Sequence, residues 1–463
     1  MDDTKLLNIK SGQTITGVIA FLFSILAIGF IAVYGLPGRL SFVFVLACLA
    51  LLLSIIKTDF ALIVLIFSML LSPELRVGQI TGRQVVIRAD DIMLFIVFFG
   101  WLAKMAIYKE LGLLRTSALN TPILTYISIC IISSLIGISR GQINLKETVF
   151  YILKYFEYFL LFFMVTNNIK DTRQIKIFIY ALISVCFIIG LYAWQLHLLG
   201  VTRVTAPFEG EAGEANTLAG YLLLMMATIG GLIIHSSYKL RLLLLGLLVF
   251  IIPPFLFTLS RGAWFAFIPM YLSFLIISKR AKIALLFILI IAVLILPWSL
   301  PGFVKTRIKY TFVPGKTYNI YGKSITFDES TIRRVESWSY AFKKWQKRPI
   351  LGYGVPAGIV TDNQYGRVLR ETGIVGFMAF VWLMMMIFRV AYYAYRFSGD
   401  DFSRGIALGF LCGFIGLLVH GLSSEVFIII RIMEPFWFLA AIVSRLPEVS
   451  VSGAKDTSIL FKY

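Results

Sequence analysis

The sequence predicts an all-α, polytopic transmembrane helix bundle of about fourteen spans, and three observations carry that prediction. Of the 463 residues, 59% are hydrophobic and only 14% are charged, a composition that soluble domains do not have. The apolar residues gather in long runs, and the charged residues lie in the short segments between them. The net charge of +19 is therefore spread over many loops. This spread excludes a basic nucleic-acid-binding domain, so no nucleic-acid partner is expected.

The long apolar runs give the predicted spans. They occupy residues 15–34, 39–56, 59–73, 91–108, 121–138, 149–166, 175–198, 217–235, 239–257, 262–278, 282–299, 373–396, 405–422 and 426–444. With the N-terminus inside, the short cytoplasmic loops hold more Lys and Arg than the short outer loops, so both termini are predicted to be cytoplasmic. The polar start precedes a run long enough to span, which argues against a cleavable signal peptide.

The same runs divide the chain into regions. The predicted regions are spans in 1–299, a large periplasmic loop in 300–372, spans in 373–446 and a cytoplasmic tail in 447–463. The loop contains STIRRVESWSYAFKKWQKRP, in which Val335, Trp338 and Phe342 share one face of a predicted helix. Such an amphipathic helix either lies in the membrane interface or packs on the end of the bundle.

Isolated arginines in the predicted outer loops are an exception to the usual charge distribution. They are Arg76, Arg83, Arg88, Arg140, Arg203 and Arg261. Positive charge normally collects in cytoplasmic loops, so outward arginines need another reason. A guanidinium group grips phosphate oxygens in pairs, and we therefore expect an anionic ligand at the outer face.

Ionisable residues within the spans have mainly structural interpretations. Lys154 and Glu157 are three residues apart and are predicted to pair on one helix face, a neutralised pair being favoured over a functional one. Arg431 is expected to brace the bundle rather than to bind substrate. The chain has no HExxH, P-loop or GxSxG sequence, and its scattered histidines do not make a zinc site, so no metal and no cofactor are expected.

Three segments in the predicted outer regions stand out. The first is Arg203 followed by NTLAGYLL, and the second is the tight turn TLSRGAWFAF around Arg261. The third runs from RPILGYGVPAG into TDNQYGRVLRETGIVGF. In their order along the chain and their shared position on the outer side of the membrane, these segments resemble the O-antigen polymerase and ligase superfamily. Members of that superfamily are integral-membrane glycosyltransferases of bacterial surface polysaccharides. The resemblance covers roughly residues 200–445 by motif and the whole chain by topology, and it implies a GT-C-like bundle.

The resemblance also implies a reaction. Members take a glycan from undecaprenyl pyrophosphate at the periplasmic face of the inner membrane and join it to an acceptor hydroxyl, without a metal or a nucleotide sugar. Arg261 and Arg203 are then expected to neutralise the leaving pyrophosphate, and a general base deprotonates the attacking hydroxyl with inversion. Asp362 and Arg261 are the expected catalytic residues. The residues expected to bind substrate are Arg203, Asn216, Arg88, Asn363, Tyr365, Arg367 and His420.

One departure from the superfamily bears on the choice of activity. Ligases of this group carry a histidine just before the asparagine of the third segment, where this chain has Asp362. An aspartate can serve as the base, and it is also a common helix-cap residue. The substitution favours a repeat-unit polymerase over a ligase that transfers the glycan to lipid A core or another acceptor. A lipid-linked oligosaccharide flippase or other transporter is the alternative of a different class. Membrane lipids and a chain-length regulator are the further expected partners, the regulator by resemblance alone.

Overall fold

The computed structural model describes residues 58–451 apart from short gaps at 73, 81–82, 108–114, 208–212, 300, 311–315, 321–322 and 359–361. The predicted spans 15–34 and 39–56 and the tail after residue 451 lie outside the described residues. The described helices are α3 (Thr58–Leu71), α4 (Ala89–Ile107), α5 (Asn120–Ser139), α6 (Leu145–Asn168), α7 (Thr172–Leu198), α8 (Ala215–His235), α9 (Tyr238–Phe257), α10 (Arg261–Ile277), α11 (Lys282–Ser299), α12 (Gly302–Lys309), α13 (Glu329–Lys347), α14 (Gln364–Phe397), α15 (Asp401–His420) and α16 (Ile430–Val451).

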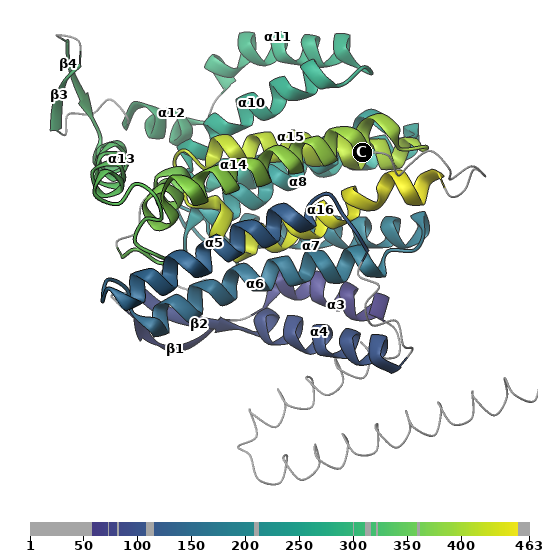
Figure 1. Cartoon of the computed structure of the whole chain (residues 1–463). Coiled ribbons are helices and arrows are strands. Elements are labelled where there is room, and N and C mark those ends of the chain that lie inside the picture. Colours follow the sequence, from purple (N-terminus) through teal and green to yellow (C-terminus); the bar gives the residue numbers. More distant parts are fainter. Residues whose placement is uncertain are drawn as a thin grey trace, which may run out of the picture.

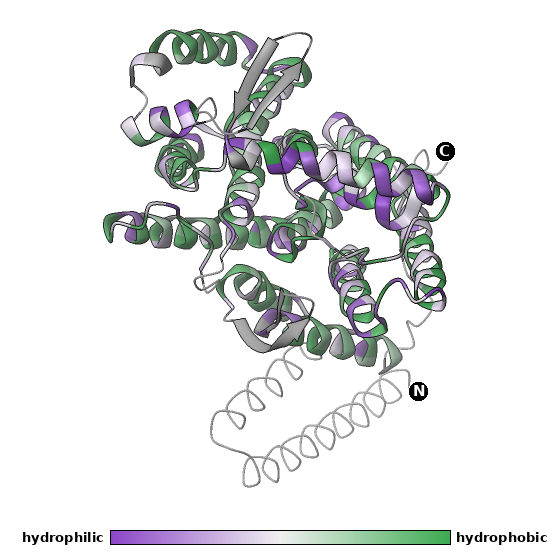
Figure 2. Ribbon diagram, turned by 90° about the vertical axis from the view of Figure 1, so that its left-hand side faces the viewer, coloured by the Kyte–Doolittle hydropathy of each residue, from purple (hydrophilic) through white to green (hydrophobic). Residues whose placement is uncertain are grey.

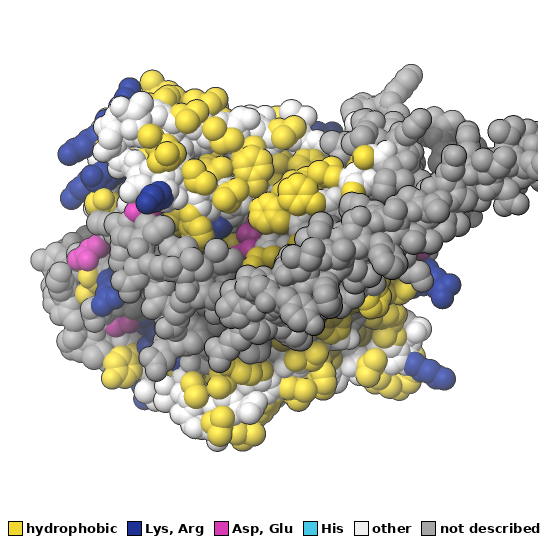
Figure 3. Space-filling view, turned by 90° about the horizontal axis from the view of Figure 1, so that it is seen from below, with side chains coloured by type: hydrophobic (Ala, Val, Ile, Leu, Met, Phe, Trp, Pro, Cys, Tyr) yellow, Lys and Arg dark blue, Asp and Glu magenta, His cyan; other side chains and the backbone are white. Residues whose placement is uncertain are grey.

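The predicted helical membrane bundle is confirmed. Each predicted span from residue 59 onward coincides with one of these helices, and the chain is a multi-pass membrane protein. Seven of the described helices are long and apolar enough to cross a membrane. Others that match predicted spans are shorter, such as α3 and α10, or carry several charges, such as α16. In Figure 3, hydrophobic side chains make up much of the described surface that is visible, with Lys and Arg mostly toward its two ends.

Two short antiparallel hairpins are the strands in the described part of the chain. β1 (Glu74–Ile80) pairs with β2 (Arg83–Arg88), and β3 (Lys316–Ile320) pairs with β4 (Lys323–Phe327). Both hairpins, together with α12 and α13, lie at one end of the bundle, which we call the α13 end (Figure 1). Figure 2 looks onto this end and shows α13, which follows the hairpin β3–β4, lying across it. The predicted long loop thus forms a structured cap.

The cap helix α13 is amphipathic, as its sequence predicts. Ile332 and Ala341 are buried, whereas Val335, Trp338 and Phe342 are exposed. The indole nitrogen of Trp338 donates a hydrogen bond to the carbonyl of Leu422 at 3.3 Å. The helix therefore rests on the bundle by one edge and leaves aromatic and aliphatic side chains uncovered, which suits a position at the membrane interface.

The centre of the bundle is the close packing of α8 against α15, the most deeply buried pair of its spanning helices. Glycines allow this approach. A Cβ atom added at Gly409 would lie 2.6 Å from the carbonyl oxygen of Ala227 and from the Cα atom of Thr228. Because the obstructing atoms belong to the backbone, they cannot rotate away. Small residues at helix crossings are the usual way for membrane helices to pack closely.

We therefore expect the Gly409→Leu variant to lower the free energy of unfolding by about 3 kcal/mol through overpacking. The measurement is the thermal midpoint of the detergent-solubilised protein by fluorescence-detected size exclusion. Gly246→Leu on α9 is the matched control, because an added Cβ there meets nothing within 4 Å. Equal midpoints for the two variants would show that the glycine contact does not matter.

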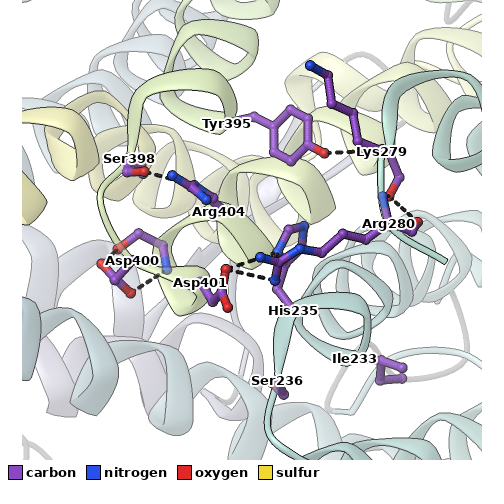
Figure 4. Close-up of polar contacts among 12 residues, drawn as sticks. Ile233, His235, Ser236, Lys279, Arg280, Tyr395, Ser398, Asp400, Asp401 and Arg404 are labelled. Atoms are coloured by element: carbon purple, nitrogen blue, oxygen red, sulfur yellow. Dashed lines mark hydrogen bonds and ion pairs between the residues drawn. The ribbon is translucent and has the colours of Figure 1, made fainter.

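The opposite end of the bundle carries a small ion-pair group (Figure 4). Arg280, in the turn between α10 and α11, lies 2.8 Å from Asp401 of α15, and the ring of His235 lies 3.7 Å from the same carboxylate. The hydroxyl of Tyr395 accepts a hydrogen bond from the backbone of Lys279 at 3.3 Å. About half of the Arg280 and Asp401 side chains is exposed, so this pair contributes little to stability. It supplies matched controls for variants at the α13 end.

Two predictions about interior charges have different outcomes. The predicted ion pair of Lys154 with Glu157 is wrong, since no ion pair joins these two described residues. The Lys154 ammonium lies over the ring of Phe150 instead, 4.5 Å from its centroid, a cation–π contact that competes with a carboxylate three residues away.

Arg431 braces the bundle, as predicted. Its guanidinium donates to the carbonyls of Pro207 at 2.6 Å and Leu70 at 3.2 Å. It thereby joins α16 to the end of α3 and to the loop before α8. Such backbone carbonyls are suitable partners for a charge buried inside a membrane bundle.

Candidate active site

Four arginines from four separate segments come together at the α13 end. Arg261 is the first residue of α10, Arg203 lies in the loop between α7 and α8, Arg307 comes from α12 and Arg334 from α13. Each of them interacts electrostatically with at least one of the others. We call these four residues the arginine cluster.

The turn before α10 organises the cluster through its carbonyl groups. Arg203 donates from Nε to the carbonyl oxygen of Thr258 at 3.3 Å, and Arg307 donates from Nε to that of Leu259 at 3.4 Å. Leu259 has a φ of 50°, in the left-handed region that a non-glycine residue seldom adopts. This tight turn places Arg261 directly after two carbonyls that hold the neighbouring arginines.

The cluster has an excess of positive charge. Burial together with the charges of Arg261 and Arg203 lowers the pKa of Arg334 below its ordinary value. Burial and the charge of Arg261 likewise lower the pKa of Arg307. Guanidinium groups held close together in this way repel one another, and an anion bound between them relieves the repulsion. The site is therefore suited to a ligand with several negative oxygens.

One carboxylate already lies in the cluster. Asp328 precedes α13, and its Oδ2 atom lies 2.6 Å from Nη2 of Arg261, with both side chains about one-eighth exposed. This ion pair fixes the start of α13 against the start of α10. A bound anion would share Arg261 with Asp328 or displace it, so the pair links ligand binding to the position of the cap helix.

Asp362 and Asn363 dock onto the middle of α13. The backbone N–H of Asp362 donates to Oγ of Ser337 at 3.1 Å, and Nδ2 of Asn363 donates to the same oxygen at 3.0 Å. Asn363 also caps the N-terminus of α14. The Asp362 side chain is exposed and interacts electrostatically with Arg334. The structure thus places the predicted base beside the arginine cluster.

Two other predicted residues lie beneath the cluster. Oδ1 of Asn216, in the first turn of α8, accepts a hydrogen bond from Oγ of Ser260 at 2.7 Å. His420 is fully buried under the start of α10, where a Cβ added at Gly262 would lie 3.6 Å from its ring. Neither ring nitrogen of His420 has a hydrogen-bond partner among the described residues. The charge of Arg334 acts on this buried ring.

The segment RPILGYGVPAG positions α14 rather than contacting the cluster. The hydroxyl of Ser133 on α5 donates to the carbonyls of Leu351 and Glu371, the latter at 2.7 Å. α14 breaks at Gly373, whose φ is 64° and whose added Cβ would lie 2.2 Å from the carbonyl oxygen of Ile350. Only glycine fits there. The glycines of this segment therefore allow the loop before α14 to approach the backbone of α5 and of the break in α14 closely.

Arg88 lies away from the arginine cluster. Its guanidinium is buried and lies 3.6 Å from the Asp90 carboxylate and 3.4 Å from the Asp91 carboxylate. The backbone N–H of Arg88 also donates a hydrogen bond to the Asp91 carboxylate at 2.9 Å. Asp91 thus caps α4 in the way a capping box does. Arg76 and Arg83 lie in the hairpin β1–β2, and Arg140 is exposed after α5.

Arg367 and Tyr365 are held inside the first part of α14. Arg367 lies 3.0 Å from Glu371 and 2.6 Å from Glu425 in a buried ion-pair network. The Tyr365 hydroxyl donates to the carbonyl of Leu418. These contacts join the first part of α14 to α15 and to the segment that follows α15.

Arg307, Arg334 and Asp328 are the site residues that the sequence analysis missed. All three come from the predicted periplasmic loop, where charged residues are common and give no signal of their own. The available signal was that Arg334 lies off the apolar face of the amphipathic helix and must therefore face something polar. Among the described residues, no group of three or more His, Cys, Asp or Glu side chains is placed to hold a metal ion.

Comparison with known families finds a domain match that covers part of this site. A family model described as O-antigen ligase matches residues 242–381, a range that contains Arg261, Asp328, Arg334 and Asp362. No curated protein matches the chain. The match supports an O-antigen ligase or polymerase type of function in general, with lipid-linked oligosaccharides as substrates. It confirms the predicted resemblance to the O-antigen polymerase and ligase superfamily, through a domain that includes three members of the arginine cluster.

Proposed function

We propose that the protein is a polysaccharide repeat-unit polymerase. It transfers a growing glycan from undecaprenyl pyrophosphate to a sugar hydroxyl of a second lipid-linked repeat, with inversion and without a metal. The active site lies at the α13 end, facing the periplasm, in an inner-membrane protein whose termini are both cytoplasmic. A chain-length regulator is the proposed protein partner.

The arginine cluster is the observation that carries this proposal. The leaving group is a lipid pyrophosphate with about two negative charges, and the charge on its bridging oxygen grows as the glycosidic bond breaks. Arg261 and Arg203 neutralise that charge, and Arg307 and Arg334 enclose it. Guanidinium groups arranged before the reaction stabilise developing charge without reorganisation, which makes this the largest contribution to catalysis.

Attack by the acceptor and departure of the pyrophosphate belong to one displacement. The acceptor hydroxyl attacks the anomeric carbon from the side opposite the pyrophosphate, and the Asp362 carboxylate takes its proton. The glycosidic C–O bond to the lipid breaks as the new one forms, and the pyrophosphate leaves with the bond electrons. Asp362 is exposed, which lets it meet an incoming hydroxyl, and its interaction with Arg334 ties it to the donor site.

The test of the polymerase is synthesis of a product ladder. Purified protein receives one lipid-pyrophosphate-linked repeat as its only substrate, in the presence of a chelator. We expect longer lipid-linked products from the wild type and a loss of about 10²-fold or more in rate for Asp362→Asn, the usual contribution of a general base. Asp328→Asn is the matched control, because it removes the other carboxylate of the cluster and should retain most of the rate.

A ligase is the second candidate, because the matching family model is described as O-antigen ligase. The same assay separates the two activities when lipid A core is added. Transfer of the glycan to the core with no ladder from the repeat alone would overturn the polymerase and establish the ligase. Absence of both products would overturn the polymerase and the ligase that acts on lipid A core, and would favour a ligase that uses another acceptor or a flippase.

A further inference from the structure

A second group of cations lies at the C-terminal end of α13. Lys344 lies over two tyrosine rings, 5.7 Å from the centroid of Tyr340 and 5.5 Å from that of Tyr353. The Arg348 guanidinium is 4.9 Å from the centroid of Tyr353, and the guanidinium of Arg370 on α14 is 5.7 Å from that of Tyr340. We call these five residues the tyrosine–cation cluster.

Arg370 is the member whose surroundings indicate a ligand. Its side chain is only 2% exposed, and neither Nε nor Nη1 forms a hydrogen bond with any described residue. The adjacent carboxylate, Glu371, is already paired with Arg367 at 3.0 Å. A buried guanidinium that lacks hydrogen bonds is costly, and an anion that reaches it removes that cost.

The other two cations are also without carboxylate partners. In the described part of the chain, no ion pair joins Lys344 or Arg348 to an acidic side chain, and Arg348 donates instead to the amide oxygen of Gln142. Lys343 lies on the same stretch of α13 and adds further positive charge. The half-buried tyrosine rings form a surface with Lys344 and Arg348 that is both aromatic and positive, and the buried guanidinium of Arg370 lies against the ring of Tyr340.

Carbohydrates are recognised by surfaces of this composition. The negative face of a tyrosine ring attracts the polarised C–H groups of a sugar ring, and guanidinium and ammonium groups bind carboxylate or phosphate substituents. We propose that the tyrosine–cation cluster is a subsite for a negatively charged sugar residue of the glycan substrate. This assignment rests on the proposed function, since it takes the ligand to be the glycan.

The position of the subsite fits that ligand. α13 has 19 residues and is therefore about 28 Å long, with the arginine cluster near its N-terminus and the tyrosine–cation cluster near its C-terminus. A glycan whose pyrophosphate lies at Arg261 would reach the second cluster several sugars along its length. The length of α13 would then fix the distance between the bound acidic sugar and the reacting end of the glycan.

The test is a binding titration of the full-length protein in detergent micelles at low ionic strength. The probes are hexagalacturonic acid, which carries carboxylates, neutral maltohexaose and inorganic pyrophosphate. We expect hexagalacturonic acid to bind more tightly than maltohexaose, and Arg370→Gln to weaken that binding about tenfold or more, as loss of a charged hydrogen bond does. Arg261→Ala should leave the affinity for hexagalacturonic acid unchanged and weaken that for pyrophosphate.

Lys344→Ala is a second test of the subsite in case the buried Arg370 variant misfolds, because Lys344 is only half-buried. It should also weaken hexagalacturonic acid binding, whereas Lys347→Ala, an exposed lysine one turn away, should change it little. Equal affinity in wild type, Arg370→Gln and Lys344→Ala would overturn the subsite, as would an effect on pyrophosphate alone. Ladder synthesis by a wild type that does not bind hexagalacturonic acid overturns the subsite but not the polymerase. Binding of hexagalacturonic acid by a wild type that makes no ladder overturns the polymerase but not the subsite.

Discussion

Replacing Arg261 with alanine should lower the rate of ladder synthesis by about 10²- to 10³-fold, the usual effect of removing one preorganised group that stabilises transition-state charge. The reason is that Arg261 lies at the centre of the arginine cluster, where Arg307, Arg334 and Arg203 all interact with it. The Arg261→Lys variant keeps the charge but loses the bidentate fork, and its rate should fall between those of alanine and wild type. The rate is measured under single-turnover conditions with saturating substrate.

Two controls separate catalysis from architecture. Arg280→Ala removes an arginine from an exposed ion pair at the opposite end of the bundle and should leave the rate unchanged. Asp328→Asn breaks the contact between Arg261 and the start of α13 while leaving the cationic cluster intact. If Asp328→Asn lost as much activity as Arg261→Ala, then Arg261 would act by anchoring α13 and not by holding the anion.

The Arg367→Ala variant should destabilise the protein by about 3–5 kcal/mol, because it leaves two carboxylates buried without their counterion. Arg367 is buried, and it is the partner of both Glu371 and Glu425. The expected phenotype is a large fall in the thermal midpoint and in the yield of folded protein, with activity per folded molecule retained. Arg140→Ala, which removes an exposed arginine, should change stability by less than about 0.5 kcal/mol.

An Arg367→Ala protein with wild-type stability and no activity would contradict this assignment and return Arg367 to the substrate site. The variant pair Glu425→Gln and Glu371→Gln extends the test. Each removes one of the two carboxylates facing Arg367, so each should cost less than removal of the arginine itself.

The bundle was predictable because apolar runs report burial in lipid directly. Helix caps are local features too, although none was predicted at these positions: Asn144 and Asp171 precede α6 and α7, and each accepts a hydrogen bond from a backbone N–H of the first turn. These features depend on residues close in sequence. They therefore need no knowledge of which helices are neighbours.

The partner of each arginine in the predicted outer regions was less predictable, although nearby residues in the sequence indicated some of these partners. Arg88 is followed by Asp90 and Asp91, and Arg367 by Glu371 four residues later, and in both cases those acids are the partners in the structure. Arg261 has no acidic residue nearby in sequence, and its partner is Asp328. An outward arginine without a local carboxylate was thus the better candidate for a ligand site.

The remaining site residues depend on tertiary placement. Arg307 and Arg334 reach the cluster because α12 and α13 fold back over the start of α10, and no periodicity in the loop specifies that path. Arg370, whose Nε and Nη1 atoms lack hydrogen bonds to described residues, differs from its neighbour Arg367 by the face of the helical turn that it occupies. Such distinctions require the packed structure.

The most direct test of the central claim is whether the arginine cluster binds the lipid pyrophosphate. The measurement is the dissociation constant of undecaprenyl pyrophosphate for the purified protein, by microscale thermophoresis at two salt concentrations, in wild type and in Arg203→Ala/Arg261→Ala. We expect the double variant to bind at least about tenfold more weakly, and salt to weaken wild-type binding more than variant binding. Unchanged affinity and unchanged salt dependence in the double variant would contradict the account, because the cluster would then not be the pyrophosphate site.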